Sequence, residues 1–510
     1  MTWRCSLWMM NRRKGKATKI FSLARRRLAL NRVGIPRCFS GGSQLKDAAC
    51  DLKLCNFGAL LLLALFGSSI SIGHAASLEL RDTHNAFIET YEISTNSGTA
   101  IAIKDNIDIA GRVTSAGSLA MAENVARTDA FLIEKLRDAK FHIVGKTNLS
   151  EWANFRSTNS VSGWSSYGGQ TTNAAGNSLN PCGSSSGSAV AVATGLVEVA
   201  IGTETNGSIS CPASVNGIVG MKPTVGLVSR HGIVPIAASQ DTAGPMGQDV
   251  AIVALTLAAI AGPDSNDSAT ALIPANFDFD FAEAAANRSL RGMRFGLLTS
   301  GSQYPEAQML LRQIRQLVVG LGGEVVDIED SRDYPSDESY RILLYEFSRG
   351  LEDYLASASG PRKTLSEILA FNEQNRRSVM PYFEQEIFQQ ALAVKDETEK
   401  YQAALEAVDL IRQQTLMLLH NNDLDAFLGL TRGPAWQIDY VAGDDAAISK
   451  VPRFGNGQFA AITGMPHITI PAFSMNDLPV GLSVIGAPWS DKALLSYAAA
   501  LESALKSQAP

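Results

Sequence analysis

The sequence predicts an α/β fold arranged as a single large domain. Short strands alternate with helical segments along most of the chain, an alternation that is typical of α/β proteins. Met293–Leu298 and Glu324–Ile328 show the unit well, because these strand-like runs flank a segment with apolar residues at helical spacing. The chain of 510 residues is also long enough for a large core and one or two domains.

The remaining elements are predicted from the same kinds of pattern, which are apolar runs for strands and helical spacing of apolar residues for helices. In chain order we expect a strand at Thr99–Ile103 that ends at Lys104, an amphipathic helix at Thr128–Ala139, a strand at Phe141–Gly145, a turn and short helix at Lys146–Phe155, a polar loop at Ser157–Asn180, a tightly packed helix at Ser188–Gly195, a buried strand at Leu196–Gly202 and a mostly helical region at 335–420. Aromatic residues of that last region are interpreted as core. The alternative is that Phe371–Asn375 and Tyr382–Glu386 wall a substrate pocket.

The first 76 residues read as a leader. Residues 1–46 hold 12 lysines or arginines and no acidic residue, Phe57–Phe66 is an apolar block, and small residues follow at Gly73, Ala75 and Ala76. This order is typical of a secretory signal peptide, so we expect a leader at 1–76, a domain at 77–510 and a periplasmic or secreted protein. A mitochondrial presequence and an uncleaved membrane anchor are the alternatives.

The charge, cysteines and histidines of the sequence indicate which partners, thiol states and metals to expect. Residues 77–510 carry a net charge of −17, which argues against a nucleic acid partner. Cys182 and Cys211 are the two cysteines of this part, and we interpret them as buried free thiols, with a bridge as the alternative. The six histidines are scattered without metal-ligand spacing, so we expect no metal and no cofactor.

Two serine-glycine loops flank an apolar segment between Cys182 and Ser208, which reads CGSSSGSAVAVATGLVEVAIGTETNGS. Glycine lets such loops approach a ligand closely. Gly183–Gly187 (GSSSG) also matches the nucleophile elbow of α/β hydrolases, with Ser185 as nucleophile. That mechanism needs a histidine downstream, and the candidates are His231, His420 and His467.

The same stretch resembles the signature of the amidase signature family, serine hydrolases that cut carboxamides with a Ser-Ser-Lys triad. The family pattern, roughly GGSSGGSA and then GTDTGGSIRIPA, corresponds here to CGSSSGSA and GTETNGSISCPA. The resemblance extends from about Asn85 to the C-terminus and includes closing strands in Ala460–Phe473 and Leu478–Gly486. It implies a large mixed sheet covered by helices on both faces.

The resemblance also implies roles for individual residues. Ser208 matches the nucleophile, Ser184 the bridging serine whose peptide bond is cis, and Lys104 of IAIKDNID the lysine. Backbone N–H groups of Thr205, Asn206, Gly207 and Ser208 would form the oxyanion hole, with Ser185 as a supporting donor. The family has Asp, Gly and Arg where this chain has Glu204, Asn206 and Ser210, so a bracing carboxylate–guanidinium contact is missing. A lysine base must be neutral, and burial beside hydroxyls lowers its pKa from near 10.4.

The expected activity is hydrolysis of amides to an acid and ammonia or an amine. Two stretches, VGLVSRHGIVPIAASQDTAGPM and FNEQNRRSVMPYFEQE, most resemble the peptide amidase branch. The partner is then a peptide or small-molecule amide, with a membrane involved only if the leader stays attached. Trp436 and Asp439 of Thr431–Asp444 are expected to line or shape the substrate cleft. The alternatives are an A-type subunit of the glutamyl-tRNA amidotransferase and a non-catalytic binding protein of the same fold.

Overall fold

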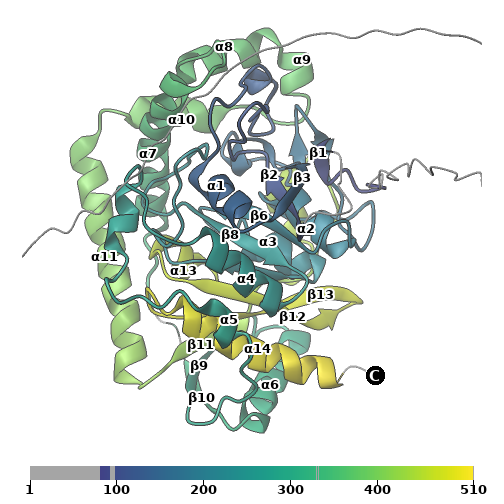
Figure 1. Ribbon diagram of the computed structural model, residues 1–510, viewed down its shortest axis with the longest axis vertical. Helices are drawn as coiled ribbons and strands as arrows, with labels where there is room; N and C mark the ends of the chain where they lie inside the picture. Colours follow the sequence, from purple (N-terminus) through teal and green to yellow (C-terminus); the bar gives the residue numbers. More distant parts are fainter. Residues whose placement is uncertain (1–80, 92–97, 329, 331, 509–510) are drawn as a thin grey trace, which may run out of the picture. The chain divides into compact units, whose positions relative to one another are not determined.

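The computed structural model describes residues 81–91, 98–328, 330 and 332–508 (Figure 1). All of them belong to one compact unit, Gly73–Pro510. The predicted leader at 1–76 lies outside the described residues, so its assignment stays a prediction. Among the described helices, none has the length and apolar character that crossing a membrane requires.

The described residues form a mixed sheet of eleven strands in the order β1-β3-β2-β6-β8-β7-β12-β13-β11-β9-β10. Strand β2 runs parallel to β3 and β6, and β9 runs parallel to β10 and β11, whereas the other neighbours are antiparallel. The strands are β1 (Phe87–Thr90), β2 (Ala100–Lys104), β3 (His142–Thr147), β6 (Val199–Glu204), β7 (Val219–Lys222), β8 (Thr242–Gly247), β9 (Arg294–Leu298), β10 (Glu324–Ile328), β11 (Ala426–Leu430), β12 (His467–Met475) and β13 (Leu478–Ile485), with β4 (Trp164–Ser165) and β5 (Gly169–Gln170) in a separate hairpin.

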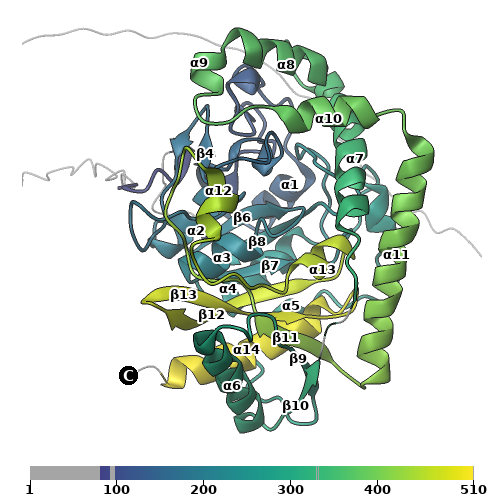
Figure 2. The same cartoon turned by 180° about the vertical axis from the view of Figure 1, so that it is seen from behind.

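Helices cover both faces of this sheet, as Figures 1 and 2 show. Helices α2 and α3 pack on one face, and α1, α4, α5, α6 and α14 gather on the other. A further group, α7 to α11, packs largely within itself at one side. The helices are α1 (Phe131–Asp138), α2 (Ser186–Ala193), α3 (Ser210–Asn216), α4 (Val250–Ile260), α5 (Phe281–Ala284), α6 (Pro305–Gly320), α7 (Ser336–Ser357), α8 (Leu365–Gln374), α9 (Arg376–Val379), α10 (Glu386–Val394), α11 (Thr398–Asn421), α12 (Gly443–Ile448), α13 (Gln458–Ile462) and α14 (Asp491–Gln508), with 3-10 turns η1 (Leu119–Met121), η2 (Glu151–Asn154) and η3 (Ser268–Leu272).

Local signals in the sequence explain where several helices begin and end. The Asp249 side chain accepts from Ile252 N at the start of α4, and Thr364 with Glu367 forms a capping box at the start of α8. Helix α3 ends at Gly217, whose φ of 70° lies in the left-handed region that favours glycine.

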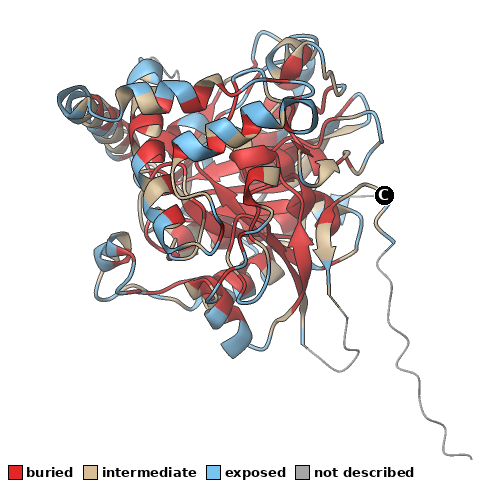
Figure 3. Cartoon of the chain, turned by 90° about the horizontal axis from the view of Figure 1, so that it is seen from above, coloured by how far each residue is buried: buried red, intermediate tan, exposed pale blue. Residues whose placement is uncertain are grey.

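The alternation of side chains along β2 directs Lys104 to the face that α2 covers. Ile101 and Ile103 enter the core on the α1 and α4 side, whereas Ala102 packs against α2. Lys104 therefore follows Ala102 toward α2, because side chains two residues apart in a strand share a face. Figure 3 shows most of the sheet as the buried centre of the described residues.

Most predicted elements are confirmed, with ends that differ by a few residues. The sequence places a strand at Glu324–Ile328 and the structure has β10 at the same bounds, while the region expected to be helical, 335–420, contains α7 to α11. Tyr345, Phe347 and Phe383 are buried as expected for core, whereas Tyr382 is exposed. The described residues before Lys104 contain β1 and β2 and no helix.

Candidate active site

Two loops and one strand end meet at a single point of the sheet. Strands β2 and β6 are parallel neighbours, so Lys104 and the segment after Glu204 emerge at the same edge. Ser184 directly precedes α2, and Ser208 lies between β6 and α3. Ser185 N donates to Ser208 O at 3.1 Å, which fastens one loop to the other.

The Lys104 amine is buried and surrounded by oxygen atoms of hydroxyl and carbonyl groups. Its Nζ lies 2.8 Å from Ser184 Oγ, 3.0 Å from Ser185 Oγ, and 2.8 Å and 3.2 Å from Thr203 Oγ1 and Thr203 O. Lys104 is 0% exposed and forms no ion pair with a described carboxylate. A neutral Lys104 amine can make these same contacts, because its lone pair can accept a hydrogen bond from a hydroxyl.

These surroundings lower the pKa of Lys104 to about 7. Burial is the main cause, because an ammonium loses its hydration without gaining a counter-ion in contact, and the more distant charges of Asp241 and Glu204 partly oppose the shift. A substantial fraction of Lys104 is then neutral at pH 7. The strand ends at Lys104 as expected, and the turn residues Asp105 and Asn106 that follow it are also nearly inaccessible.

The peptide bond between Gly183 and Ser184 is cis, as the resemblance implies for the bridging serine. A side chain at position 183 would collide with the Ser150 hydroxyl, so the tight approach requires glycine there. Ser185 Oγ accepts from Thr203 N at 3.1 Å and lies 3.0 Å from Thr203 O, which anchors the loop to β6. Ser185 thereby holds Ser184 and Lys104 together.

The loop from Thr205 to Ser208 presents backbone N–H groups. None of these four N–H groups donates to another described residue, although Thr205 and Ser208 are buried. Gly207 has a φ of 83°, a conformation that favours glycine. Unused N–H donors on a fixed loop are what an oxyanion hole needs, so this segment can hold a negatively charged oxygen.

Glu204 braces this loop without an arginine. Its Oε2 accepts from Ile209 N at 2.8 Å and from Ser210 N at 2.9 Å, which caps the first turn of α3. The missing carboxylate–guanidinium contact is thus replaced by a carboxylate bound directly to the backbone. Asn206 is exposed and its side chain makes no hydrogen bond to a described residue, so it adds no brace of its own.

A disulfide joins Cys182 to Cys211, with the two Cα atoms 6.0 Å apart. The expectation of buried free thiols is therefore wrong. The starts of α2 and α3 lie side by side on one face of the sheet, and this packing brings together cysteines that are 29 residues apart. The bridge ties the loop of Ser184 to the helix that follows Ser208, and it packs against Trp436.

A cavity of about 490 Å³, called the first cavity below, borders both loops. Its lining includes Gly183 from one loop and Asn206 and Gly207 from the other. Its apolar wall includes Trp436, Ile448 and Phe454, and its charged lining residues are Arg432, Asp444 and Arg453. Asn154 Oδ1 in the same lining is buried without a hydrogen-bond partner among the described residues, so it is an acceptor available to a substrate N–H.

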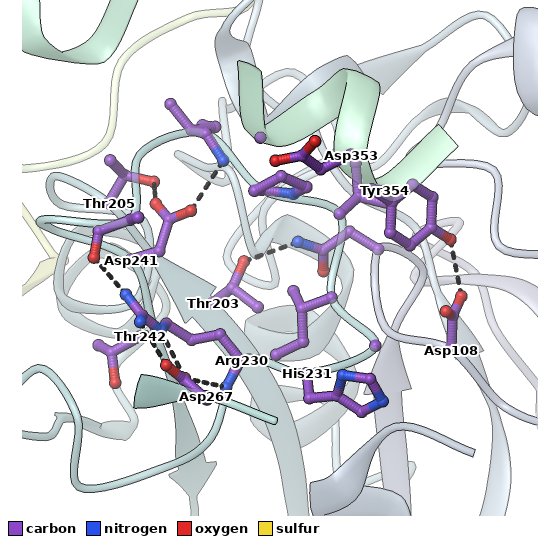
Figure 4. Close-up of a pocket in the computed structure, with 18 of the residues that line it drawn as sticks. Asp108, Thr203, Thr205, Arg230, His231, Asp241, Thr242, Asp267, Asp353 and Tyr354 are labelled. Atoms are coloured by element: carbon purple, nitrogen blue, oxygen red, sulfur yellow. Dashed lines mark hydrogen bonds and ion pairs between the residues drawn. The ribbon is translucent and has the colours of Figure 1, made fainter. Parts of the chain in front are cut away.

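A second cavity of about 380 Å³ lies against the other part of the same loop and is drawn in Figure 4. It is lined by Thr203, Glu204 and Thr205 together with residues of α7 such as Tyr354. Asp241 stands in this cavity and accepts from Thr205 Oγ1 at 2.6 Å, as the dashed line in Figure 4 marks. The segment 203–207 therefore borders both cavities.

The two residues predicted to line the cleft differ in position. Trp436 is buried, lines the first cavity and donates through Nε1 to Asp444 at 3.2 Å. Asp439 lines neither of the two cavities. Its carboxylate accepts from Val441 N and Ala442 N and pairs with Lys450. The Asp439 side chain therefore stabilises a local turn. The segments Phe371–Asn375 and Tyr382–Glu386 are also absent from both linings.

The geometry argues against Ser185 as the nucleophile of an elbow. Ser185 is 0% exposed, and no described histidine lies within hydrogen-bond distance of it. His467 is buried and contacts Ser483 Oγ at 2.7 Å, and burial lowers its pKa to about 4. His231 lines the second cavity instead.

Thr203 and Asp241 are site residues that local sequence patterns do not single out. Thr203 contacts Lys104 because β6 pairs with β2 in one register, and no periodicity reveals that contact. Asp241 holds Thr205 Oγ1 and accepts from Ile236 N and Ala237 N, and burial raises its pKa to about 6. Its place in the run QDTAGPM, within the family resemblance, is the available signal.

Comparison with known proteins gives one consistent result. A family model described as Amidase matches residues 77–495. A probable amidase of Arabidopsis thaliana is 33% identical over 435 residues, which cover 84% of this chain and 80% of that protein. The A-type subunit of the glutamyl-tRNA(Gln) amidotransferase of Saccharolobus solfataricus is 32% identical over 421 residues, 80% of this chain and 84% of that protein. The native peptide amidase of Stenotrophomonas maltophilia has a similar structure, with a TM-score of 0.74, 41% identity, and coverage of 80% and 83% of the two chains.

Proposed function

This chain belongs to the amidase family and is an amide-hydrolysing enzyme, and we propose that it cleaves peptide C-terminal amides or related small amides through Ser208, Ser184 and Lys104. The observation that carries the proposal is the contact of 2.8 Å between Lys104 Nζ and Ser184 Oγ, at a lysine that no described carboxylate contacts. A base held neutral in this way can take a proton at neutral pH.

The proton path follows from these contacts. Neutral Lys104 accepts the proton of Ser184, and Ser184 accepts the proton of Ser208 as the Ser208 oxygen attacks the amide carbonyl. Ser208 Oγ makes no hydrogen bond to a described residue, so it is free to turn toward Ser184. The negative oxygen of the tetrahedral intermediate then lies against the unused N–H groups of Thr205 to Ser208.

Collapse of this intermediate returns the proton through Ser184 to the leaving nitrogen. The C–N bond breaks, ammonia or an amine leaves, and an ester of Ser208 remains. Water attacks that ester by the same path, with Lys104 again as the base, and releases the acid. Because the first cavity borders Gly183 and Gly207, we place the acyl part of the substrate there.

Peptide amides are the proposed substrates because of two separate likenesses. The peptide amidase of Stenotrophomonas maltophilia is 41% identical over 80% of this chain. The stretches 225–246 and 371–386 are also those that resemble the peptide amidase branch. The first cavity, at about 490 Å³, has room for a short peptide end.

The likeness to the A-type subunit of a glutamyl-tRNA amidotransferase gives a second candidate function. That role needs ATP and partner subunits, and the net charge of −17 on residues 77–510 argues against RNA as a direct partner. Ammonia release from a panel of peptide amides and anilides, measured without ATP, decides between the candidates. Turnover by the chain alone, lost in Ser208→Ala, supports the amidase; no turnover of any amide contradicts it and leaves the amidotransferase role or a binding protein.

We also propose export of the mature chain to the periplasm or beyond the cell. The order of basic, apolar and small residues in 1–76 supports this, and so does the disulfide between Cys182 and Cys211, because disulfides persist in oxidising compartments. A membrane anchor and a mitochondrial presequence remain the alternatives. N-terminal sequencing of native protein tests the proposal: a start near Ala76 or Ser77 supports it, and a start near Met1 contradicts it.

A further inference from the structure

The charge of the first cavity differs from that of the rest of the domain. Residues 77–510 have a net charge of −17, yet the charged residues that line this cavity are two arginines and one aspartate. A positive pocket in an acidic protein is expected where the ligand is negative, because complementary charge guides and orients a ligand.

Asp444 forms no ion pair in direct contact with either arginine, although its charge acts on Arg432 through space. Its carboxylate accepts from Ser162 N at 2.8 Å, from Asn180 Nδ2 at 2.9 Å and from Trp436 Nε1 at 3.2 Å. These bonds tie three separate segments together around the cavity, and burial raises the pKa of the carboxyl. Asp444 is therefore occupied as a structural acceptor.

Arg432 and Arg453 have no ion-pair partner among the described residues, and neither side chain donates a hydrogen bond to one. Burial is the main cause that lowers the pKa of Arg432, and the nearby charge of Arg453 acts in the same direction, whereas Asp444 and Asp445 oppose this only through space. Both arginines thus line one cavity without a contacting anion among the described residues. For the largely buried Arg432, a ligand that supplies a negative group would offset the cost of burying its charge.

The surroundings of Arg432 leave its hydrogen-bonding edge free. The guanidinium carbon lies 4.8 Å from the ring centre of Trp436, which is 2% exposed and forms part of the cavity wall. Stacking of this kind fixes the plane of the guanidinium, and the five N–H donors at its edge fit a carboxylate with two parallel bonds. Phe454 and Ile448 offer apolar contact to the carbon chain that bears the carboxylate.

We propose that the first cavity selects amides that carry a carboxylate on the acyl part, with Arg432 as its anchor and Arg453 at the exposed rim. This inference rests on the proposed function, because it places the acyl part in the cavity beside Gly183 and Gly207. The substrate class is then acidic peptide amides or amides of dicarboxylic acids. The chemistry at Ser208 is unchanged, since the carboxylate contributes binding and orientation alone.

The test compares matched substrates of the full enzyme. Acetyl-Ala-Xaa amides with glutamate, methionine or lysine as Xaa vary the charge at similar length, and succinyl in place of acetyl moves the carboxylate to the other end of the substrate. We expect kcat/KM for the better acidic substrate to exceed that for its neutral match by about tenfold, and the ratio to fall as salt is added. Equal values for acidic and neutral substrates at both positions overturn the proposal.

Variants assign the preference to the arginine. Arg432→Gln should bring the ratio of acidic to neutral substrate close to one, and Arg432→Glu should favour the lysine amide. Arg377→Gln removes the same charge from an arginine of α9 that lines neither cavity, and it should keep the ratio. A preference that survives in Arg432→Gln contradicts the assignment.

A binding measurement keeps this test separate from that of the proposed function. Ser208→Ala protein is titrated with the glutamate and methionine amides in a calorimeter. Tighter binding of the glutamate amide supports the inference even if no amide is turned over. The absence of turnover would contradict the proposed function alone. Equal binding of the two amides, with turnover intact, overturns the inference and leaves the proposed function standing.

Discussion

Two lysines are buried at the ends of neighbouring strands, and their surroundings differ in one respect. Lys104 ends β2 and Lys146 lies in β3, and the parallel pairing sets Ile103 beside Lys146. Lys146 Nζ lies 3.0 Å from Asp105 Oδ1 and donates to Ile107 O at 2.7 Å. Lys104 contacts hydroxyls and a carbonyl but no described carboxylate.

The comparison shows that burial alone does not make a base. Both side chains are 0% exposed, but the charge of Lys146 is balanced by a contacting carboxylate. Lys146 has a contacting carboxylate that stabilises the fold, whereas Lys104 has only hydroxyl and carbonyl contacts, and burial lowers its pKa. A pKa lowered from 10.5 to about 7 corresponds to a cost on the order of 5 kcal/mol for the charged form.

The largest expected effect is the loss of turnover in Lys104→Met. Methionine fills a similar volume without a base, so kcat/KM should fall on the order of 10⁴-fold or more. The protein should stay folded, because no carboxylate loses its counter-ion. Steady-state kinetics and a thermal melt measure both quantities. Activity within tenfold of the wild type would remove Lys104 from the mechanism.

Lys146→Met should act on stability instead. The change leaves the Asp105 carboxylate buried without its cation, and breaking such a pair costs about 3–5 kcal/mol. We expect this loss in the free energy of unfolding from urea titration, with activity per folded molecule largely kept. The double variant Lys146→Met/Asp105→Asn is the control and should recover most of the loss. If Lys146→Met instead removes activity from a stable protein, the contrast between the two lysines fails.

The hydroxyls around Lys104 should not be equivalent. Ser184→Ala removes the proton carrier and should lower kcat by about 10²- to 10³-fold, less than the loss of Lys104, since water can relay the proton. Thr203→Val removes an equally close oxygen, at 2.8 Å, that lies off the path, and we expect roughly a tenfold loss. Equal losses in the two variants would mean that Ser184 serves only to position the lysine.

The pH dependence gives the most specific signal. If neutral Lys104 is the base, kcat/KM should rise about tenfold per pH unit up to roughly pH 7 and then level off. The unfolded chain holds this proton up to about pH 10.4, so between pH 7 and that value it binds more protons than the folded protein. The free energy of unfolding of the wild type, minus that of Lys104→Met, should therefore rise with pH in this window. A flat difference between the two proteins would contradict a lowered pKa.

The sequence predicts much of this site, but not all of it. The α/β fold, the helices on both faces and the serine-glycine loops follow from periodicity and resemblance, and the structure brings Lys104 and Ser184 into contact. The disulfide does not follow from the sequence, because the spacing of 29 residues carries no information on whether α2 and α3 pack together. Thr203 and the arginines of the first cavity depend on strand register and on loops that meet across the fold, which local patterns do not encode.

Asp439 illustrates a further limit. It lies in an aromatic stretch three residues after Trp436, and aromatic and charged side chains of this kind are expected in a substrate cleft. The chain turns at 439–442, so that one side chain lines the cavity while the other caps the turn. Arg432, four residues before Trp436, is one of the three charged residues that share the cavity with it.

The identity of the attacking oxygen tests the central claim most directly. The folded wild-type enzyme is treated with a fluorophosphonate, digested, and the modified serine is located by mass spectrometry. The account predicts a single label on Ser208, formed much more slowly in Lys104→Met. A label on Ser185, together with loss of activity on substitution of His231, His420 or His467, would contradict it and restore the elbow mechanism.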